Sequence, residues 1–162
     1  MATPYRRPGV DPTCGAAVSL GTVWGMSTRT RLLVTALAAW SLFVWVNRIT
    51  NAWTGDEGLF SKLVSTVLAA ALIVVAVAAV SEVWRRDARR AALLSKALAG
   101  GTIAVWVVRA PMILLGGWSI GFLVVHMVLA AASIALAVVV WRAVSADTEA
   151  LDAGPGRPEL PL

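Results

Sequence analysis

The sequence predicts an all-α, polytopic membrane protein with four transmembrane helices, arranged as two tandem, parallel helical hairpins. Two observations predict this fold. First, 59% of the 162 residues are hydrophobic and only 14% are charged, and the mean hydropathy is +0.78. The apolar residues are gathered in runs long enough to cross a bilayer, which is typical of membrane proteins and not of globular domains.

The second observation is an internal repeat with an offset of 61 residues. Residues 44–48 are Val-Trp-Val-Asn-Arg, and residues 105–109 are Val-Trp-Val-Val-Arg. At the same offset, the run Val-Leu-Ala-Ala-Ala at 67–71 recurs unchanged at 128–132. A constant register through two separate blocks favours duplication of a two-span unit. Two such copies insert in the same sense and are related by an axis along the membrane normal.

Residues 1–28 have two interpretations. They form a disordered leader, or the start is assigned too early and Met26 is the initiator. The run Ser-Thr-Arg-Thr-Arg after Met26 leads directly into the first apolar span, which favours the second interpretation. The order of charged, apolar and small residues in a signal peptide is absent. The single Cys14 excludes an internal disulfide.

The transmembrane domain is expected over residues 29–142, with spans at about 32–53, 59–84, 92–114 and 120–141. At about 1.5 Å per residue, each span is long enough for a hydrocarbon core of about 30 Å. Pro111 is expected to break the third span near its end, and Gly116 and Gly117 turn the chain into the fourth. Residues 143–162 hold four acidic residues and three prolines and are expected to form a disordered cytoplasmic tail.

The basic residues predict the orientation, because cytoplasmic loops of membrane proteins are enriched in Lys and Arg. Basic residues precede the first span, fill the loop between the second and third, and follow the fourth, whereas the two opposite loops carry only Lys62. Both termini are therefore expected in the cytoplasm, with the protein in a bacterial plasma membrane. Tryptophans are expected at both interfaces, namely Trp84 and Trp141 inside and Trp53 and Trp118 outside. Orientation and anionic lipid account for the formal charge of +5 without nucleic acid.

Arg48 and Arg109 occupy equivalent positions of the repeat, on the order of 24 Å from the inner boundary of the membrane. One interpretation is structural, because a cation near a helix C-terminus complements the macrodipole and its side chain can reach the headgroups. The other is a site for an anion or carboxylate. Helical side chains lean toward their own N-terminus, here toward the membrane interior, which favours the second interpretation.

Three further polar residues are candidate ligand-binding groups at this depth. His126 is the counterpart of Ser65, and it shares a helix face with Ala130, Ser133 and Ala137 that is expected to face the bundle. Its simplest role is packing, with a hydrogen bond to a neighbouring helix. Haem ligation would require Met112 or Met127 as the second ligand. Asn47 and Asn51 lie one turn apart and either bridge helices or bind a ligand.

Two other features have local explanations. Glu82 is one turn before Arg85, so a salt bridge along the helix is expected. Gly117 and Gly121 form a Gly-x-x-x-Gly step, and Gly100 and Gly101 lie in the middle of the third span. Both pairs permit close approach of helices.

The stretch Trp40–Trp45, followed by Asn47 and Arg48, resembles the first helix of small four-helix membrane proteins of actinobacteria. Val108–Pro111 and His126 are similar to the same group. The resemblance implies a type of protein and no activity.

Three functions follow from the sequence. The first is a non-enzymatic accessory or scaffold subunit, which binds a larger membrane complex or further copies of itself. The alternative is a small binding or transport unit, in which Arg48 and Arg109 hold an anionic headgroup or carboxylate at the outer side. The third is a haem or redox subunit. Motifs for catalysis, metal clusters and phosphate loops are absent from the sequence, so neither an enzyme nor a bound cofactor is expected.

Overall fold

The computed structural model describes residues 26–55, 58–85 and 87–153, and in these ranges the chain is helical, without strands. The four helices are α1 (Thr28–Thr54), α2 (Leu59–Arg85), α3 (Ala88–Leu114) and α4 (Ile120–Ala153). Each helix is long and apolar enough to cross a membrane. The predicted all-α fold with four transmembrane helices is confirmed, and the chain is an integral membrane protein.

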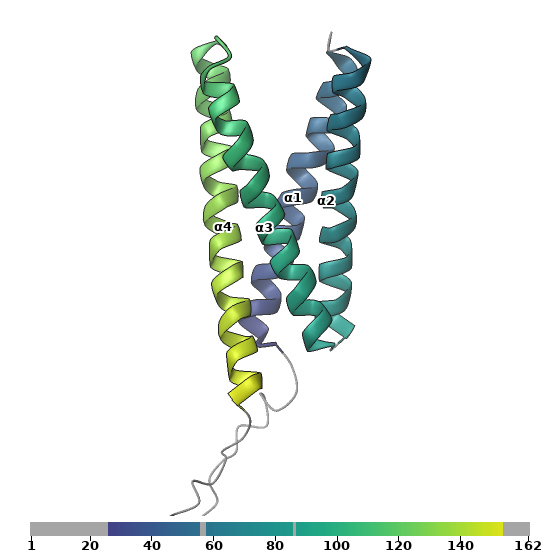
Figure 1. Ribbon diagram of the computed structural model, residues 1–162, viewed down its shortest axis with the longest axis vertical. Coiled ribbons are helices and arrows are strands. Elements are labelled where there is room, and N and C mark those ends of the chain that lie inside the picture. Colours follow the sequence, from purple (N-terminus) through teal and green to yellow (C-terminus); the bar gives the residue numbers. More distant parts are fainter. Residues whose placement is uncertain (1–25, 56–57, 86, 154–162) are drawn as a thin grey trace, which may run out of the picture.

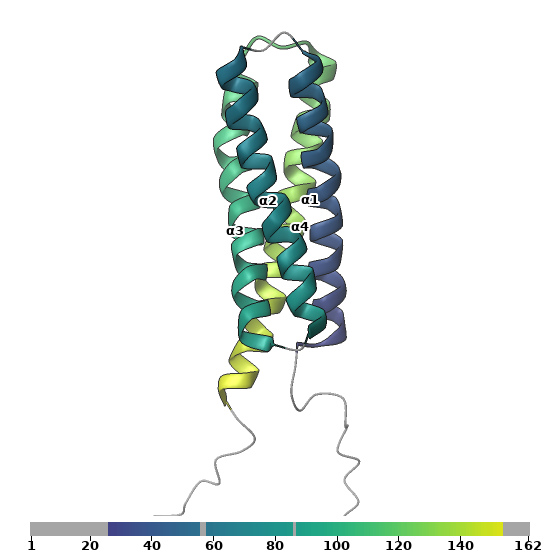
Figure 2. The same cartoon turned by 90° about the vertical axis from the view of Figure 1, so that its right-hand side faces the viewer.

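The helices form two hairpins, α1–α2 and α3–α4, in which α1 and α3 run in the same direction (Figure 1). One end of the bundle holds the connection between α2 and α3, the start of α1 and the end of α4, and we refer to it as the closed end. The other end holds the turns after Thr54 and Leu114 and is the open end. Figure 2 shows the same four helices from the side, with both turns at the same end of the bundle.

Local sequence explains where the helices begin and turn. At the closed end, Ser27 Oγ accepts a hydrogen bond from Thr30 N, and Asp87 accepts one from Arg90 N, so each residue caps a helix N-terminus. At the open end, Gly117 has φ of 66°, a left-handed conformation that glycine adopts without a Cβ clash. This confirms the predicted turn after α3.

Three boundaries differ from the prediction. α1 and α3 begin about one turn before the predicted spans, because Ser27 and Asp87 cap them outside the apolar run. α3 continues through Pro111 to Leu114, so the predicted break is wrong. Residues 143–153 were expected to be disordered and are helical, because helix-forming residues continue beyond the apolar span. Residues 1–25 and 154–162, which hold the predicted leader and the last part of the predicted tail, lie outside the described residues.

The main hydrophobic core lies in the half of the bundle nearest the closed end, and all four helices contribute to it. Its fully buried side chains are small or medium in size and include Val34, Leu37, Ala76, Leu98 and Val140. Small side chains allow the helices to approach closely. At this end, Ser27 N donates a hydrogen bond to Asp147 Oδ2 at 2.8 Å, which joins the start of α1 to the extension of α4.

The buried positions of the two hairpins follow the 61-residue offset. Each buried residue of α1 has a buried counterpart in α3, and each buried residue of α2 has one in α4. Pairs of this kind include Leu37 with Leu98, Ser41 with Thr102, Trp45 with Trp106, and Ala76 with Ala137. Equivalent helices therefore present equivalent faces to the bundle. Duplication as the origin of this correspondence stays a prediction.

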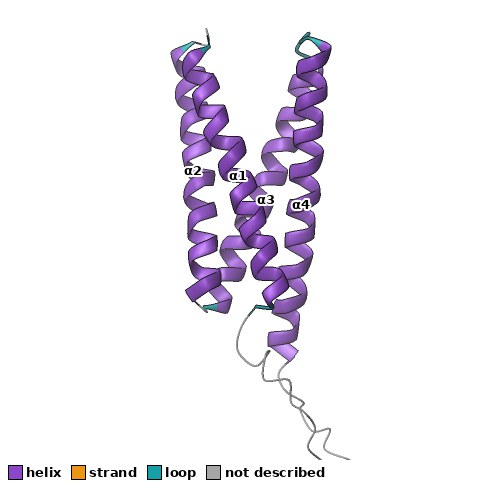
Figure 3. Cartoon of the chain, turned by 180° about the vertical axis from the view of Figure 1, so that it is seen from behind, coloured by secondary structure: helices purple, strands orange, loops and turns teal. Residues whose placement is uncertain are grey.

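Toward the open end the hairpins separate, as Figure 3 shows from behind. The change coincides with a change in side-chain size along α1 and α3. Near the closed end these helices bury Ala38 and Ala99, whereas two turns further they bury Trp45 and Trp106. Close-packed interiors accommodate larger side chains only where the backbones lie further apart. The larger side chains thus begin at the level where the hairpins diverge, and Trp45 packs there on Ala69 and Leu72 of α2.

Candidate functional site

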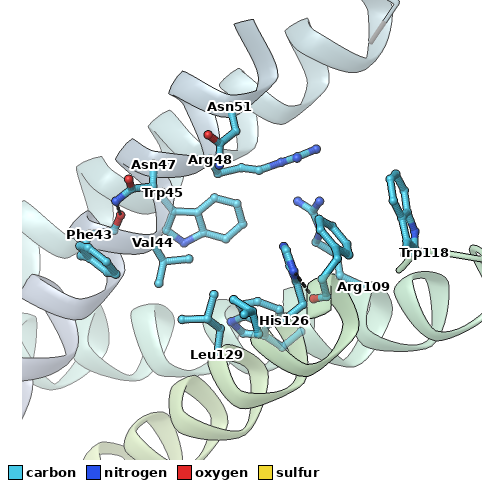
Figure 4. Close-up of a pocket in the computed structure, with 13 residues that line it drawn as sticks. Phe43, Val44, Trp45, Asn47, Arg48, Asn51, Arg109, Trp118, His126 and Leu129 are labelled. Carbon is cyan, nitrogen blue, oxygen red and sulfur yellow. Dashed lines mark hydrogen bonds between the residues drawn. The ribbon is translucent and has the colours of Figure 1, made fainter. Parts of the chain in front are cut away.

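A cavity of about 440 Å³ opens between the hairpins in the half of the bundle nearest the open end (Figure 4). Its wall is built by α1, α3, α4 and Trp118, in the connection before α4. None of the lining residues belongs to α2. The lining residues are Phe43, Val44, Trp45, Asn47, Arg48, Asn51, Trp106, Arg109, Trp118, Phe122, Val125, His126 and Leu129.

All five candidate residues predicted from the sequence line this one cavity. Arg48 comes from α1, Arg109 from α3 and His126 from α4, and Figure 4 shows their side chains pointing into the same space. Each is half-buried. Two guanidinium groups in a partly desolvated cleft form a strongly positive site, because the low local dielectric weakens their screening by water. Whether these residues bind a ligand stays a prediction.

Hydrogen bonds on α1 and α2 orient the side chains of the first hairpin. Arg48 Nη2 donates to Ser65 Oγ on α2 at 3.4 Å. Asn47 Nδ2 donates to the carbonyl oxygen of Phe43, one turn earlier, at 2.7 Å. This bond uses an amide hydrogen of Asn47 within its own helix, so the bridge between helices that was one interpretation of this residue is not observed.

His126 is fixed by its own helix. Its Nδ1 lies 2.8 Å from the carbonyl oxygen of Phe122, and the prediction of a bond to a neighbouring helix is wrong. A carbonyl only accepts, so Nδ1 carries the proton in this bond and the neutral ring offers Nε2 as an acceptor. The other part of the prediction is confirmed, because Ala130, Ser133 and Ala137 on the same face are buried in the bundle.

An aromatic stack supports the histidine and was not predicted. The rings of His126 and Phe122 stack with centroids 3.8 Å apart, and Phe122 stacks on Trp118 at 4.7 Å. Their spacing in the sequence, four residues each, was the available signal, because residues at i and i+4 meet on one helix face. The stack forms one wall of the cavity and limits the rotation of the His126 ring.

The thirteen lining residues include no Asp or Glu. The described part of the chain holds no group of three or more His, Cys, Asp or Glu that would bind a metal ion. Met112 and Met127, the predicted second ligands for haem, are not among the lining residues. The cavity therefore offers guanidinium groups, side-chain amides, one imidazole and aromatic surface, a combination that suits an anion with an apolar part.

Other residues singled out in the sequence lie away from the cavity. Arg85 Nη1 is 3.9 Å from Glu82 Oε1, which confirms the predicted salt bridge. Gly101 packs closely, because a Cβ there would lie 3.2 Å from Leu72 Cδ2 on α2. In contrast, a Cβ at Gly117 or Gly121 would meet nothing within 4 Å, so this glycine step makes no helix contact within the described chain.

Comparison with known proteins finds no matching family model, no matching curated protein and no matching solved structure.

Proposed function

We propose that this membrane protein is a small binding or transport unit for an anionic ligand, held in the cavity by Arg48 and Arg109. The observation that carries the proposal is the convergence of Arg48, Arg109 and His126, from three different helices, on one cavity. Guanidinium groups suit carboxylate and phosphate oxygens because their donors are planar and always charged. Asn47 and Asn51 add polar groups at the rim. The proposal is for binding and not for catalysis.

The distribution of charge supports an orientation for this site. The closed end carries the basic residues of the first turns of α1 and α3 and Arg85 at the end of α2, while the described part of the open end is poor in basic residues. By the positive-inside rule, the closed end and both termini face the cytoplasm. The cavity then faces the outer side of a bacterial plasma membrane, as the sequence predicted.

The alternative of an accessory or scaffold subunit stays a prediction. Large apolar side chains such as Phe60, Val67 and Leu93 cover the outside of the helices. Such surfaces are expected against lipid as well as against a protein partner. The cavity is a more specific feature than these surfaces, so it favours the binding function.

Thermal unfolding in detergent tests the proposal with hexyl phosphate, a soluble anion with a short apolar tail. A ligand that binds only the folded state raises the unfolding midpoint, because it stabilises that state by RT ln(1 + [L]/Kd). We expect hexyl phosphate to raise the midpoint of the parent protein and hexanol to leave it unchanged. In Arg48→Gln/Arg109→Gln the affinity falls by at least about 10- to 100-fold, because each charged hydrogen bond contributes about 1.5–3 kcal/mol.

The matched control is Arg85→Gln/Arg90→Gln, which removes the same charge at the closed end, where both side chains are exposed. This variant should keep the full shift with hexyl phosphate. An equal shift in the parent and in Arg48→Gln/Arg109→Gln would contradict the proposed site.

A further inference from the structure

We infer that the ligand of the cavity is an anionic phospholipid that enters from the bilayer between α1 and α4. Its phosphate lies between Arg48 and Arg109, and part of an acyl chain covers the apolar floor. The inference rests on the proposed function and names its ligand class. Three features of the cavity carry it: a lateral opening, the depth of the basic residues, and an apolar extension beneath them.

The cavity opens sideways, between α1 and α4. Toward the closed end these two helices are joined by Trp40 Nε1, which donates to Ser133 Oγ at 2.8 Å. Beyond this bond, the lining residues Phe43 on α1 and Val125 on α4 are 58% and 56% exposed. A surface at this place on a membrane-spanning bundle faces lipid. A molecule of the bilayer therefore reaches the cavity without passing through water.

The basic residues lie close to the level of the lipid headgroups, on the hydrocarbon side of the boundary. Arg48 is six residues before Thr54, Arg109 is five before Leu114, and His126 is six after Ile120. Each Cα is thus about 8–9 Å from the open end of its helix. A helix of 27 residues is about 40 Å long and exceeds a hydrocarbon core of about 30 Å by about 5 Å at each end. The guanidinium groups therefore lie just inside the boundary next to the headgroups.

The surface beneath the basic residues is apolar. Phe43 and Leu129 line the cavity about one turn further from the open end, and the buried Trp45 and Trp106 close its floor. A small water-soluble anion bound to the arginines would leave this apolar surface exposed to water. An acyl chain covers it, and burial of apolar surface contributes about 25 cal/mol per Å².

The polar groups select the headgroup. A cationic headgroup is disfavoured, because two arginines line the cavity and the described lining residues include no acid. The Nδ1–H of His126 donates to the carbonyl oxygen of Phe122, so Nε2 is the ring nitrogen left for a polar group of the ligand, and in the neutral ring it accepts from a hydroxyl. A phosphodiester with a hydroxylated, uncharged headgroup, such as phosphatidylglycerol, satisfies both conditions.

Native mass spectrometry of the full-length protein tests this inference with three probes: phosphatidylglycerol, phosphatidylethanolamine and water-soluble glycerol phosphate. We expect one phosphatidylglycerol to be retained, with a preference of roughly tenfold over phosphatidylethanolamine, the equivalent of one favourable charged contact. Arg48→Gln/Arg109→Gln should lose this preference, and Arg85→Gln/Arg90→Gln should keep it. Leu129→Trp, which fills the apolar floor, should lose the lipid and still bind glycerol phosphate.

The contrary results distinguish a failure of the lipid inference from a failure of the proposed function. Equal retention of both lipids, unchanged in Arg48→Gln/Arg109→Gln, would show non-specific lipid and overturn the inference. Binding of glycerol phosphate through the two arginines without retention of phosphatidylglycerol would overturn the lipid and leave the proposed function standing. Binding of no probe at the arginines would overturn both. Variants are compared at equal helix content by circular dichroism. Val125→Trp, at an exposed position of the lateral opening, replaces Leu129→Trp if the latter misfolds.

Discussion

At the cavity, equivalent positions of the two hairpins carry one identical and one different residue. Arg48 and Arg109 are equivalent, but Arg48 has Ser65 as its partner on α2, and the position equivalent to Ser65 on α4 is His126. The second hairpin thus has an imidazole where the first has a hydroxyl. The aromatic stack with Phe122 and Trp118 belongs to the second hairpin as well. These differences make the two sides of the cavity chemically distinct.

His126→Phe tests the role assigned to this imidazole. The phenyl ring preserves the size of the side chain and its stack on Phe122, but it removes the acceptor Nε2. Because a neutral hydrogen bond contributes about 0.5–1.5 kcal/mol, the affinity for phosphatidylglycerol should fall about three- to tenfold. Phosphatidic acid, which lacks the headgroup hydroxyls, should bind equally to both proteins. A similar loss for both lipids would show instead that His126 contacts the phosphate.

At the scale of helices, the two contacts between the hairpins, α1 with α4 and α3 with α2, differ at equivalent positions of the repeat. Where α1 meets α4, Trp40 packs on Ser133 and donates a hydrogen bond to it. At the equivalent contact between α3 and α2, the positions are occupied by Gly101 and Leu72. In the first contact the larger residue is on α1, whereas in the second contact the larger residue is on α2 and its counterpart on α3 is glycine. Glycine lets α3 approach α2 closely, whereas the indole keeps α1 and α4 apart, on the side where the cavity opens.

Gly101→Val tests this close approach. A Cβ at Gly101 would lie 3.2 Å from Leu72 Cδ2, so a larger side chain forces α2 and α3 apart. Overpacking of this kind costs about 1–3 kcal/mol. The thermal midpoint in detergent should fall, and Leu72→Ala in the same chain should recover part of the loss. The control Gly121→Ala, in open space, should not lower the midpoint. An unchanged midpoint in Gly101→Val would show that α2 and α3 separate at this contact without a loss of stability.

Helix positions were predictable from the sequence, but helix ends were less so. The apolar runs located all four spans, because hydropathy reports which residues face lipid. α4 continues to Ala153 because Val144 is buried in the core and Asp147 accepts the bond from Ser27 N. Such contacts depend on tertiary structure and not on hydropathy. The sequence also did not predict that α3 continues through Pro111. This proline lies near the end of the helix, where few backbone hydrogen bonds remain to be lost.

At the scale of the whole molecule, the sequence placed the candidate residues at one depth but could not show that they share a cavity. The 61-residue offset was sufficient to align Arg48 with Arg109. Their convergence requires the hairpins to diverge, and that depends on the volumes of Trp45 and Trp106 relative to Ala38 and Ala99. A hydropathy pattern holds no information about such packing.

The orientation of the molecule determines which leaflet supplies the ligand, and thiol labelling tests it. In a Cys14→Ser chain, Gly58→Cys reports on the open end and Asp152→Cys on the closed end, and both positions are exposed. A membrane-impermeant maleimide should label Gly58→Cys in intact cells, because the basic residues keep the closed end in the cytoplasm. Asp152→Cys should react only after permeabilisation. The reverse pattern would place the cavity at the inner leaflet, where Arg48 and Arg109 would meet cytoplasmic lipid headgroups.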